Sequence, residues 1–199
     1  MRKLCFCIST LFIATVLSSC SRSPRVTFYT LNSEVKSEAV LAAPHNGSLL
    51  IESVTLPDIV DRPQLVVRTN ANRVEILETH RWAESLKSGI PRLIADDLEG
   101  MLGTVKILSS FQHSVGNPEY RVLIDFVRFE ATPGDSVNIE AEWSLGRVLD
   151  GTPITGHFHQ REQVNSVGYE SIVAAYSRVL NALSEDIAKS FRSEFAVKQ

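Results

Sequence analysis

The strongest fold signal in the chain is the stretch Val137-Asn138-Ile139-Glu140-Ala141-Glu142-Trp143-Ser144-Leu145, in which apolar and polar side chains alternate without interruption. Successive side chains of a strand point to opposite faces, so this pattern predicts a strand with one buried and one solvated face. Residues 120–130 carry apolar groups on both faces and are joined to it by the turn-forming run 131–135. We therefore predict an antiparallel hairpin whose first strand is central in a sheet.

A second turn, at residues 150–153, leads to residues 157–164, whose polar composition is typical of an edge strand. His157 and His159 would lie on the same face of that strand, a spacing that can ligate a metal. No third ligand follows nearby, so the sequence favours two solvated histidines. We predict neither a metal site nor a cofactor.

Two segments have helical periodicity. From Trp82 to Leu102 apolar residues recur near helical spacing, which predicts a helix of roughly five turns, capped by Gly103. Pro91 lacks a backbone N–H, so we expect a kink or a break into two helices near Ser88.

The closing helix is predicted over residues 172–191, where the apolar positions fall on one helical face. Within the first helix, Asp96 and Asp97 point to different faces and so do not form a paired acid and base. Both aspartates are predicted to be solvated.

The segment before the helices reads mostly as sheet. Pro57 ends one strand and Asp61-Arg62-Pro63 marks a bend, while residues 32–47 form a looser stretch. Strands are predicted at residues 26–31, 49–56, 64–68 and 73–77, the last two as a hairpin around Asn70-Ala71-Asn72. The whole predicts an α+β fold, with a mostly antiparallel sheet packed against two main helices in a single two-layer domain.

The N-terminus reads as a lipoprotein leader. Arg2 and Lys3 precede an apolar run, residues 4–17, that is shorter than the roughly 20 residues needed to span a bilayer. The run ends in Leu17-Ser18-Ser19-Cys20, which looks like a bacterial lipobox. We expect a signal peptide at 1–19, a lipidated Cys20 bearing fatty acyl chains such as palmitate with a short tether at 20–25, and the domain at 26–199.

Composition narrows the class of protein. The 199 residues include 20 Lys and Arg against 23 Asp and Glu, and 44% are hydrophobic, which excludes a disordered chain and a globally basic nucleic-acid binder. Cys5 and Cys7 leave with the signal peptide and Cys20 is consumed by the lipid, so no disulfide is expected. Ser21 follows the cysteine, at the position where lipoproteins retained in the inner membrane usually carry Asp. We therefore expect the protein to be located at the periplasmic leaflet of the outer membrane.

Catalytic signatures are absent from the sequence. It contains no G-x-S-x-G, phosphate-binding loop or H-E-x-x-H, and no nucleophile stands out beside a base. We therefore predict no catalytic residue and no enzymatic activity.

One run stands apart from these general patterns. It is Leu56-Pro57-Asp58-Ile59-Val60-Asp61-Arg62-Pro63-Gln64-Leu65-Val66-Val67-Arg68, followed after a spacer by Arg81-Trp82-Ala83-Glu84. Together with residues 28–31, 126–130, Trp143 and 183–188, the chain resembles the ABC-type transport auxiliary lipoproteins, the PqiC-like family. The resemblance covers nearly the whole mature chain.

The resemblance implies a periplasmic partner of an MCE-domain (PqiB-like) protein and its inner-membrane components. The lipoprotein would form the outer-membrane end of a conduit for lipids or other hydrophobic molecules, as a homo-oligomer for which a ring is one arrangement. The alternative is a carrier that binds a lipid or apolar ligand in its own cavity. An empty apolar cavity of several hundred Å³ would favour the carrier.

The candidate partner-binding residues are Asp61, Arg62, Pro63 and Gln64 in the bend, with Arg81 and Trp82. They have two interpretations. As scaffold, the prolines fix the backbone, Asp61 accepts hydrogen bonds in the bend and Trp82 covers the core. As an interface, a rigid charged bend with Arg and Trp anchors is a good docking surface.

Overall fold

The computed structural model describes residues 24–33, 47–52, 54–103, 105–109, 117–149, 151–164, 166 and 168–195. Cys20, the predicted signal peptide at 1–19 and most of the looser stretch at 32–47 lie outside these residues. The elements are β1 (Thr27–Tyr29), β2 (Ser48–Ile51), β3 (Gln64–Asn70), β4 (Arg73–Trp82), α2 (Leu86–Leu102), β5 (Lys106–Ser109), β6 (Tyr120–Thr132), β7 (Ser136–Arg147), β8 (Ile154–Gln163) and α3 (Tyr169–Phe195).

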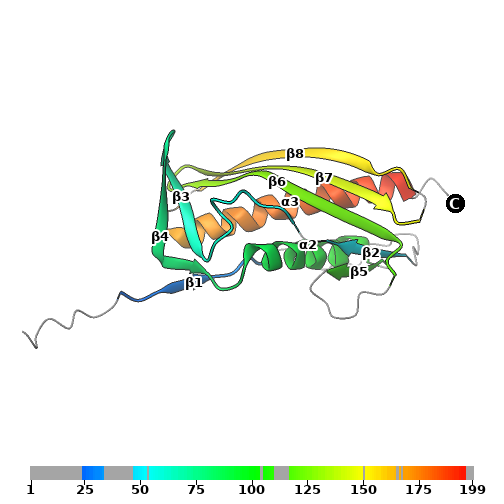
Figure 1. The fold of residues 1–199 in the computed structure, drawn as a ribbon, viewed down its shortest axis with the longest axis horizontal. Helices are drawn as coiled ribbons and strands as arrows, with labels where there is room; N and C mark the ends of the chain where they lie inside the picture. The colour runs from blue at the N-terminus through cyan, green and yellow to red at the C-terminus, as the bar shows by residue number, and fades with distance from the viewer. Residues whose placement is uncertain are drawn as a thin grey trace, which may run out of the picture.

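The strands form two sheets (Figure 1). One has the order β1-β4-β3 and the other the order β5-β2-β6-β7-β8. The long hairpins are antiparallel, as predicted, but β1 runs parallel to β4, and β2 runs parallel to both β5 and β6. Parallel neighbours need a crossover connection, and β2 reaches β6 only after β3, β4, α2 and β5. The α+β class is confirmed, with mixed rather than strictly antiparallel sheets.

The core lies between the five-stranded sheet and the helices. In β6 the side chains alternate between buried and exposed over most of the strand, and α3 runs along the sheet beneath β7 and β8 (Figure 1). The Tyr176 ring of α3 stacks on Phe129 of β6, with the ring centroids 4.3 Å apart. The predicted central place of β6 and edge place of β8 are both confirmed.

Helix α2 differs from the prediction at its start. Ser85 is the N-cap, and its Oγ accepts a hydrogen bond from the Lys87 N–H at 3.2 Å, so Trp82 ends β4 and lies outside the helix. The predicted break near Ser88 is wrong, because α2 continues through Pro91. Pro91 lies in the second turn, where its missing N–H removes a single helical hydrogen bond. Gly103 ends the helix as predicted, with φ 61° and its N–H bonded to the Glu99 carbonyl.

Other boundaries shift by a few residues. The strand predicted at 49–56 ends at Ile51, and Thr55 makes only an isolated bridge to Asp125. Strand β5 was not predicted, since four residues are too few to show a period. None of the helices in the described part of the chain is both long and apolar enough to cross a membrane.

Candidate partner-binding site

The bend predicted at 61–63 is a compact turn closed by backbone hydrogen bonds. The N–H of Val60 donates to the Pro57 carbonyl at 3.0 Å, and the N–H of Arg62 donates to the Val60 carbonyl at 2.8 Å. The Pro63 carbonyl then accepts from the Trp82 N–H at 2.7 Å. The turn therefore delivers the chain directly into the hairpin of β3 and β4.

The six predicted site residues are brought together at this point. Gln64, the first residue of β3, is the register partner of Arg81, which precedes Trp82 at the end of β4. Residues 17 or more positions apart in sequence thus lie side by side. The partner-binding role of these residues stays a prediction.

Polar side chains of the bend make surface contacts. Asp61 Oδ2 accepts from Lys87 Nζ at 2.6 Å, across to the first turn of α2. Arg81 Nε donates to the Glu78 carbonyl at 3.0 Å, and Gln64 Nε2 donates to Glu78 Oε2 at 3.3 Å. Exposed ion pairs contribute only about 0.2–1 kcal/mol, so these groups can exchange partners at little cost.

Trp82 belongs to the core. Its side chain is 6% exposed, and its ring meets Tyr176 edge-on with centroids 6.0 Å apart. The space between Trp82, Leu65 and Phe129 beneath the bend is too tight to admit a water molecule. Trp82 therefore supports the bend from below and presents little surface to a partner.

Arg62 is half-buried, and its Nε is enclosed without a hydrogen-bond partner in the described structure. A buried donor without an acceptor costs about 1–3 kcal/mol. Asp61 and Pro63, on either side of it, are exposed.

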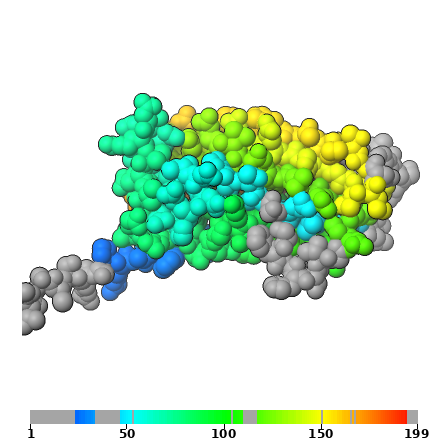
Figure 2. Space-filling model, in the orientation of Figure 1, coloured from blue at the N-terminus to red at the C-terminus, as the bar shows by residue number. Residues whose placement is uncertain are grey.

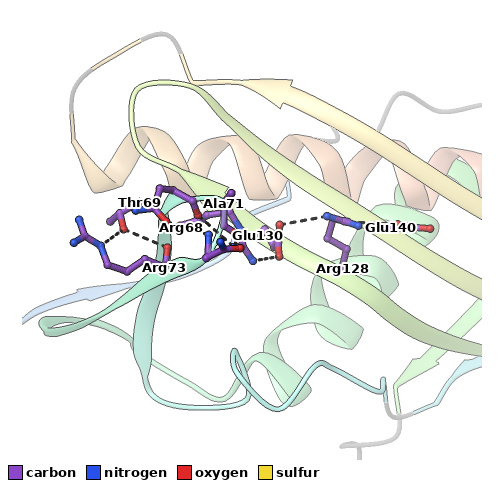
Figure 3. A network of polar contacts seen from close by, with 9 residues as sticks. Arg68, Thr69, Ala71, Arg73, Arg128, Glu130 and Glu140 are labelled. Atoms are coloured by element: carbon purple, nitrogen blue, oxygen red, sulfur yellow. Dashed lines mark hydrogen bonds and ion pairs between the residues drawn. The ribbon is translucent and has the colours of Figure 1, made fainter.

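A polar network clamps the hairpin of the small sheet onto the large one (Figure 3). Arg68 of β3 donates to Glu130 of β6 at 2.5 Å, and Arg128 lies 3.5 Å from both Glu130 and Glu140 of β7. The hydrogen bond to Glu130 raises the pKa of Arg68. Arg68 also donates to the Ala71 carbonyl at 3.0 Å, which ties the hairpin turn to the same network.

A buried carboxylate was missed by the sequence analysis. Asp97 was predicted to be solvated, but its side chain is fully buried. Ser33 donates to Oδ1 and Ser184 donates to Oδ2 at 2.9 Å. Burial raises the pKa of Asp97, and hydrogen bonds from Ser33, Ser184 and Asn181 oppose that rise in part.

This cluster joins the segment after β1 to α2 and α3, and the Asn32 N–H adds a bond to Ser177 Oγ at 3.2 Å. A signal for it existed in the sequence. Asp97 lies three residues after Ile94 and four after Leu93, which places it on the buried face of α2.

The outer face of the five-stranded sheet mixes polar side chains with exposed apolar ones such as Leu123 and Val127. A hollow of about 640 Å³ opens on it to solvent. Its lining includes Asp125, Glu142 and His157, which are register partners across β6, β7 and β8. The hollow is therefore open and partly charged, unlike the enclosed apolar cavity that a lipid carrier needs.

The two histidines of β8 have local partners. His157 Nε2 lies 3.8 Å from Glu140 Oε1, and His159 Nε2 lies 2.9 Å from Asn138 Oδ1. No group of three or more His, Cys, Asp or Glu in the described ranges is placed to hold a metal ion.

The fold and these surfaces define a class of protein: a small α+β domain with a filled core, in which Asp97 is the one buried charged residue of the described part of the chain. Residues 29–188 match the family model of the ABC-type transport auxiliary lipoprotein component. The chain belongs to that family, which is a family of transport auxiliary components and not of enzymes.

Solved structures share the fold. The crystal structure of an uncharacterized protein is 20% identical, with a TM-score of 0.70, over 84% of this chain and 99% of that one. Protein XCC0632 from Xanthomonas campestris is 18% identical, with a TM-score of 0.67, over 82% of this chain and 93% of that one. No curated protein matches. At these identities the likeness shows the fold alone.

Proposed function

We propose that this protein is an outer-membrane lipoprotein that holds the periplasmic conduit of an MCE-type transport system at the outer membrane. Cys20 carries the lipid, and the bend at Asp61 to Gln64, with Arg81, is the docking surface. The observation that carries the proposal is the family match over residues 29–188, which makes the chain an auxiliary component of a transport system. In this proposal the function depends on where the domain is held. The lipid chains fix the domain at the membrane leaflet, and the surface of the domain positions the conduit.

The filled core supports docking over carriage of a ligand. Beneath the bend the side chains leave no room for water, and the hollow on the outer sheet face is open to solvent, with Asp125 and Glu142 in its lining beside Leu123 and Trp143. A lipid tail held there would remain in contact with water, which forfeits the free energy gained by burying apolar surface.

The anchor is tested by Cys20→Ser. The variant cannot form the thioether, so we expect it in the soluble periplasmic fraction, while the unaltered protein sediments with the outer membrane. The acyl chains on Cys20 decide this, since each buried CH₂ contributes about 0.8 kcal/mol to membrane association and two or more chains together hold a protein firmly. Equal recovery of both proteins in the outer-membrane fraction would contradict the proposal.

Docking is tested by reversing the charge of the bend with Asp61→Lys. This change breaks the ion pair with Lys87 and places two cations together on the docking surface. Glu119→Lys is the matched control, because it also breaks one exposed ion pair, to Arg147, at the far end of β6. The amount of MCE-domain protein that co-purifies should fall for Asp61→Lys alone. An equal fall, or no fall, for both variants would contradict the proposal that the bend is the docking surface.

A further inference from the structure

The segment that contains β1 exposes two apolar side chains close together. Phe28 is 62% exposed and Val26 is 41% exposed. They are two positions apart in an extended segment, so their side chains point the same way. Two exposed apolar side chains on one side of a short segment form a small apolar surface that another surface can cover.

Strand β1 lies at the edge of its sheet. In the order β1-β4-β3 it has a partner on one side only, and Figure 2 shows β1 (blue) at the opposite end of the molecule from the β7–β8 turn (yellow). Tyr29 faces inward and is buried, and its hydroxyl lies 2.7 Å from Nδ1 of His80. Phe28 faces the other way, beside its register partner Arg81. The strand is thus held by one face and presents the other.

The sequence limits how far this surface can be from a membrane. Only four peptide units separate Cys20 from Pro24, where the described structure begins, and they span at most about 14 Å when fully extended. If Cys20 is lipidated, Pro24 cannot lie farther than this distance from the lipidated residue, and Val26 follows Pro24 by two residues.

The charge of the same segment matches an anionic surface. Residues 20–33 include Arg22 and Arg25 and no acidic residue, whereas all 23 acidic residues follow Ser33. The segment next to the anchor is therefore basic in a domain that is acidic elsewhere. Basic residues beside exposed aromatic and aliphatic groups are typical of segments that lie in the headgroup region of a bilayer.

We propose that the outward face of β1, made by Val26 and Phe28 with Arg25 beside them, is a second membrane contact that inserts into the headgroup region of the leaflet. This inference rests on the proposed lipid anchor. The β1 contact would fix the orientation of the domain on the membrane, because a second contact beside the tether prevents the domain from rotating freely about the tether. The bend at Asp61 to Gln64 lies two strands away from β1, roughly 10 Å at the usual strand spacing, so its partner would be held next to the bilayer.

The sequence has no cysteine after Cys20, so a cysteine introduced by substitution can be labelled at that site alone. Phe28→Cys is carried on the lipidated protein, labelled with an environment-sensitive fluorophore and reconstituted into vesicles of phosphatidylethanolamine and phosphatidylglycerol. Leu149→Cys is the control, because Leu149 is 93% exposed and follows β7 at the other end of the molecule (Figure 1). We expect quenching by doxyl-labelled lipids to be severalfold stronger at position 28 than at position 149.

Three other results would overturn the inference. Vesicle-bound protein with equal quenching at both positions would leave the lipid anchor intact and refute the β1 contact. Protein that does not float with the vesicles would refute the anchor and, with it, the contact. A label at position 28 that is already shielded in the unlipidated Cys20→Ser protein, without vesicles, would show that a second copy of the chain covers β1.

Discussion

The two sheets of this molecule are built in different ways. The five-stranded sheet rests on three long strands, β6, β7 and β8, of 13, 12 and 10 residues, that bury one face against α3. The three-stranded sheet has a three-residue edge strand and a hairpin with two irregularities of register, and it exposes charged and apolar groups together. Both sheets contribute to one core, and the second also carries the bend and β1, the surfaces for which we propose a partner and a membrane.

The largest expected effect lies where the two sheets share a core. Phe129 of β6 stacks on Tyr176 and meets Phe126 edge-on, with centroids 5.7 Å apart, and Tyr176 also supports Trp82. Phe129→Ala should cost about 3–5 kcal/mol of unfolding free energy, because it removes a fully buried ring and leaves a cavity. Chemical denaturation measures this cost, and a loss below about 1 kcal/mol would mean that the core is not shared.

The buried carboxylate gives the next effect. Asp97→Ala would leave the hydroxyls of Ser33 and Ser184 buried without their acceptor, which should cost about 1–3 kcal/mol. It should also loosen the segment after β1, since Ser33 belongs to that segment. Faster amide hydrogen exchange at residues 29–33 in the variant would show this loosening; exchange that is unchanged would mean that Asp97 does not hold the segment.

A smaller effect follows from pH. Burial raises the pKa of Asp97 above its ordinary 3.8, so the folded state binds the proton more tightly than the unfolded state does. This contribution is fully present below the unfolded pKa and is lost as pH rises through the folded one. Asp97→Asn does not titrate, so its stability relative to the unaltered protein should increase with pH across that window. Denaturation midpoints that move in parallel for both proteins would contradict a raised pKa.

The smallest effect on stability is expected at the bend. Arg62→Glu removes a guanidinium whose Nε has no described partner, so the thermal midpoint should change by less than about 2 °C, which corresponds to less than about 1 kcal/mol at this size. Co-purification with the MCE-domain protein should nevertheless weaken about tenfold, a change of about 1.4 kcal/mol. A large drop in the midpoint would instead assign Arg62 to the scaffold of the bend.

The same contrast explains what could be predicted from the sequence. The alternation at 137–145 and the apolar face of α3 are local patterns of a deeply buried layer, and both elements were predicted correctly. Gly103 was predictable because a helix end has its own local chemistry. The parallel pairing of β2 with β5 and β6 is set by contacts between segments far apart in the sequence. The local pattern of apolar residues does not show which strands will pair.

The sequence predicted the position of the candidate site and offered coverage of the core by Trp82 as one of two interpretations. The bend and its proximity to Arg81 follow from the prolines and the hairpin, but the burial of Trp82 depends on Tyr176 of α3, which lies far along the chain. Asp97 was misjudged for a related reason. A charged residue is expected to be solvated unless its partners are known, and Ser33 and Ser184 approach it only in the folded structure.

Every proposal made for this protein depends on the state of Cys20. Intact mass spectrometry of the protein purified from the outer-membrane fraction tests this residue directly. We predict a mature chain that begins at Cys20 and carries a thioether-linked diacylglyceryl group and an amide-linked acyl chain. A chain that begins at any other residue, or an unmodified Cys20, would contradict the account.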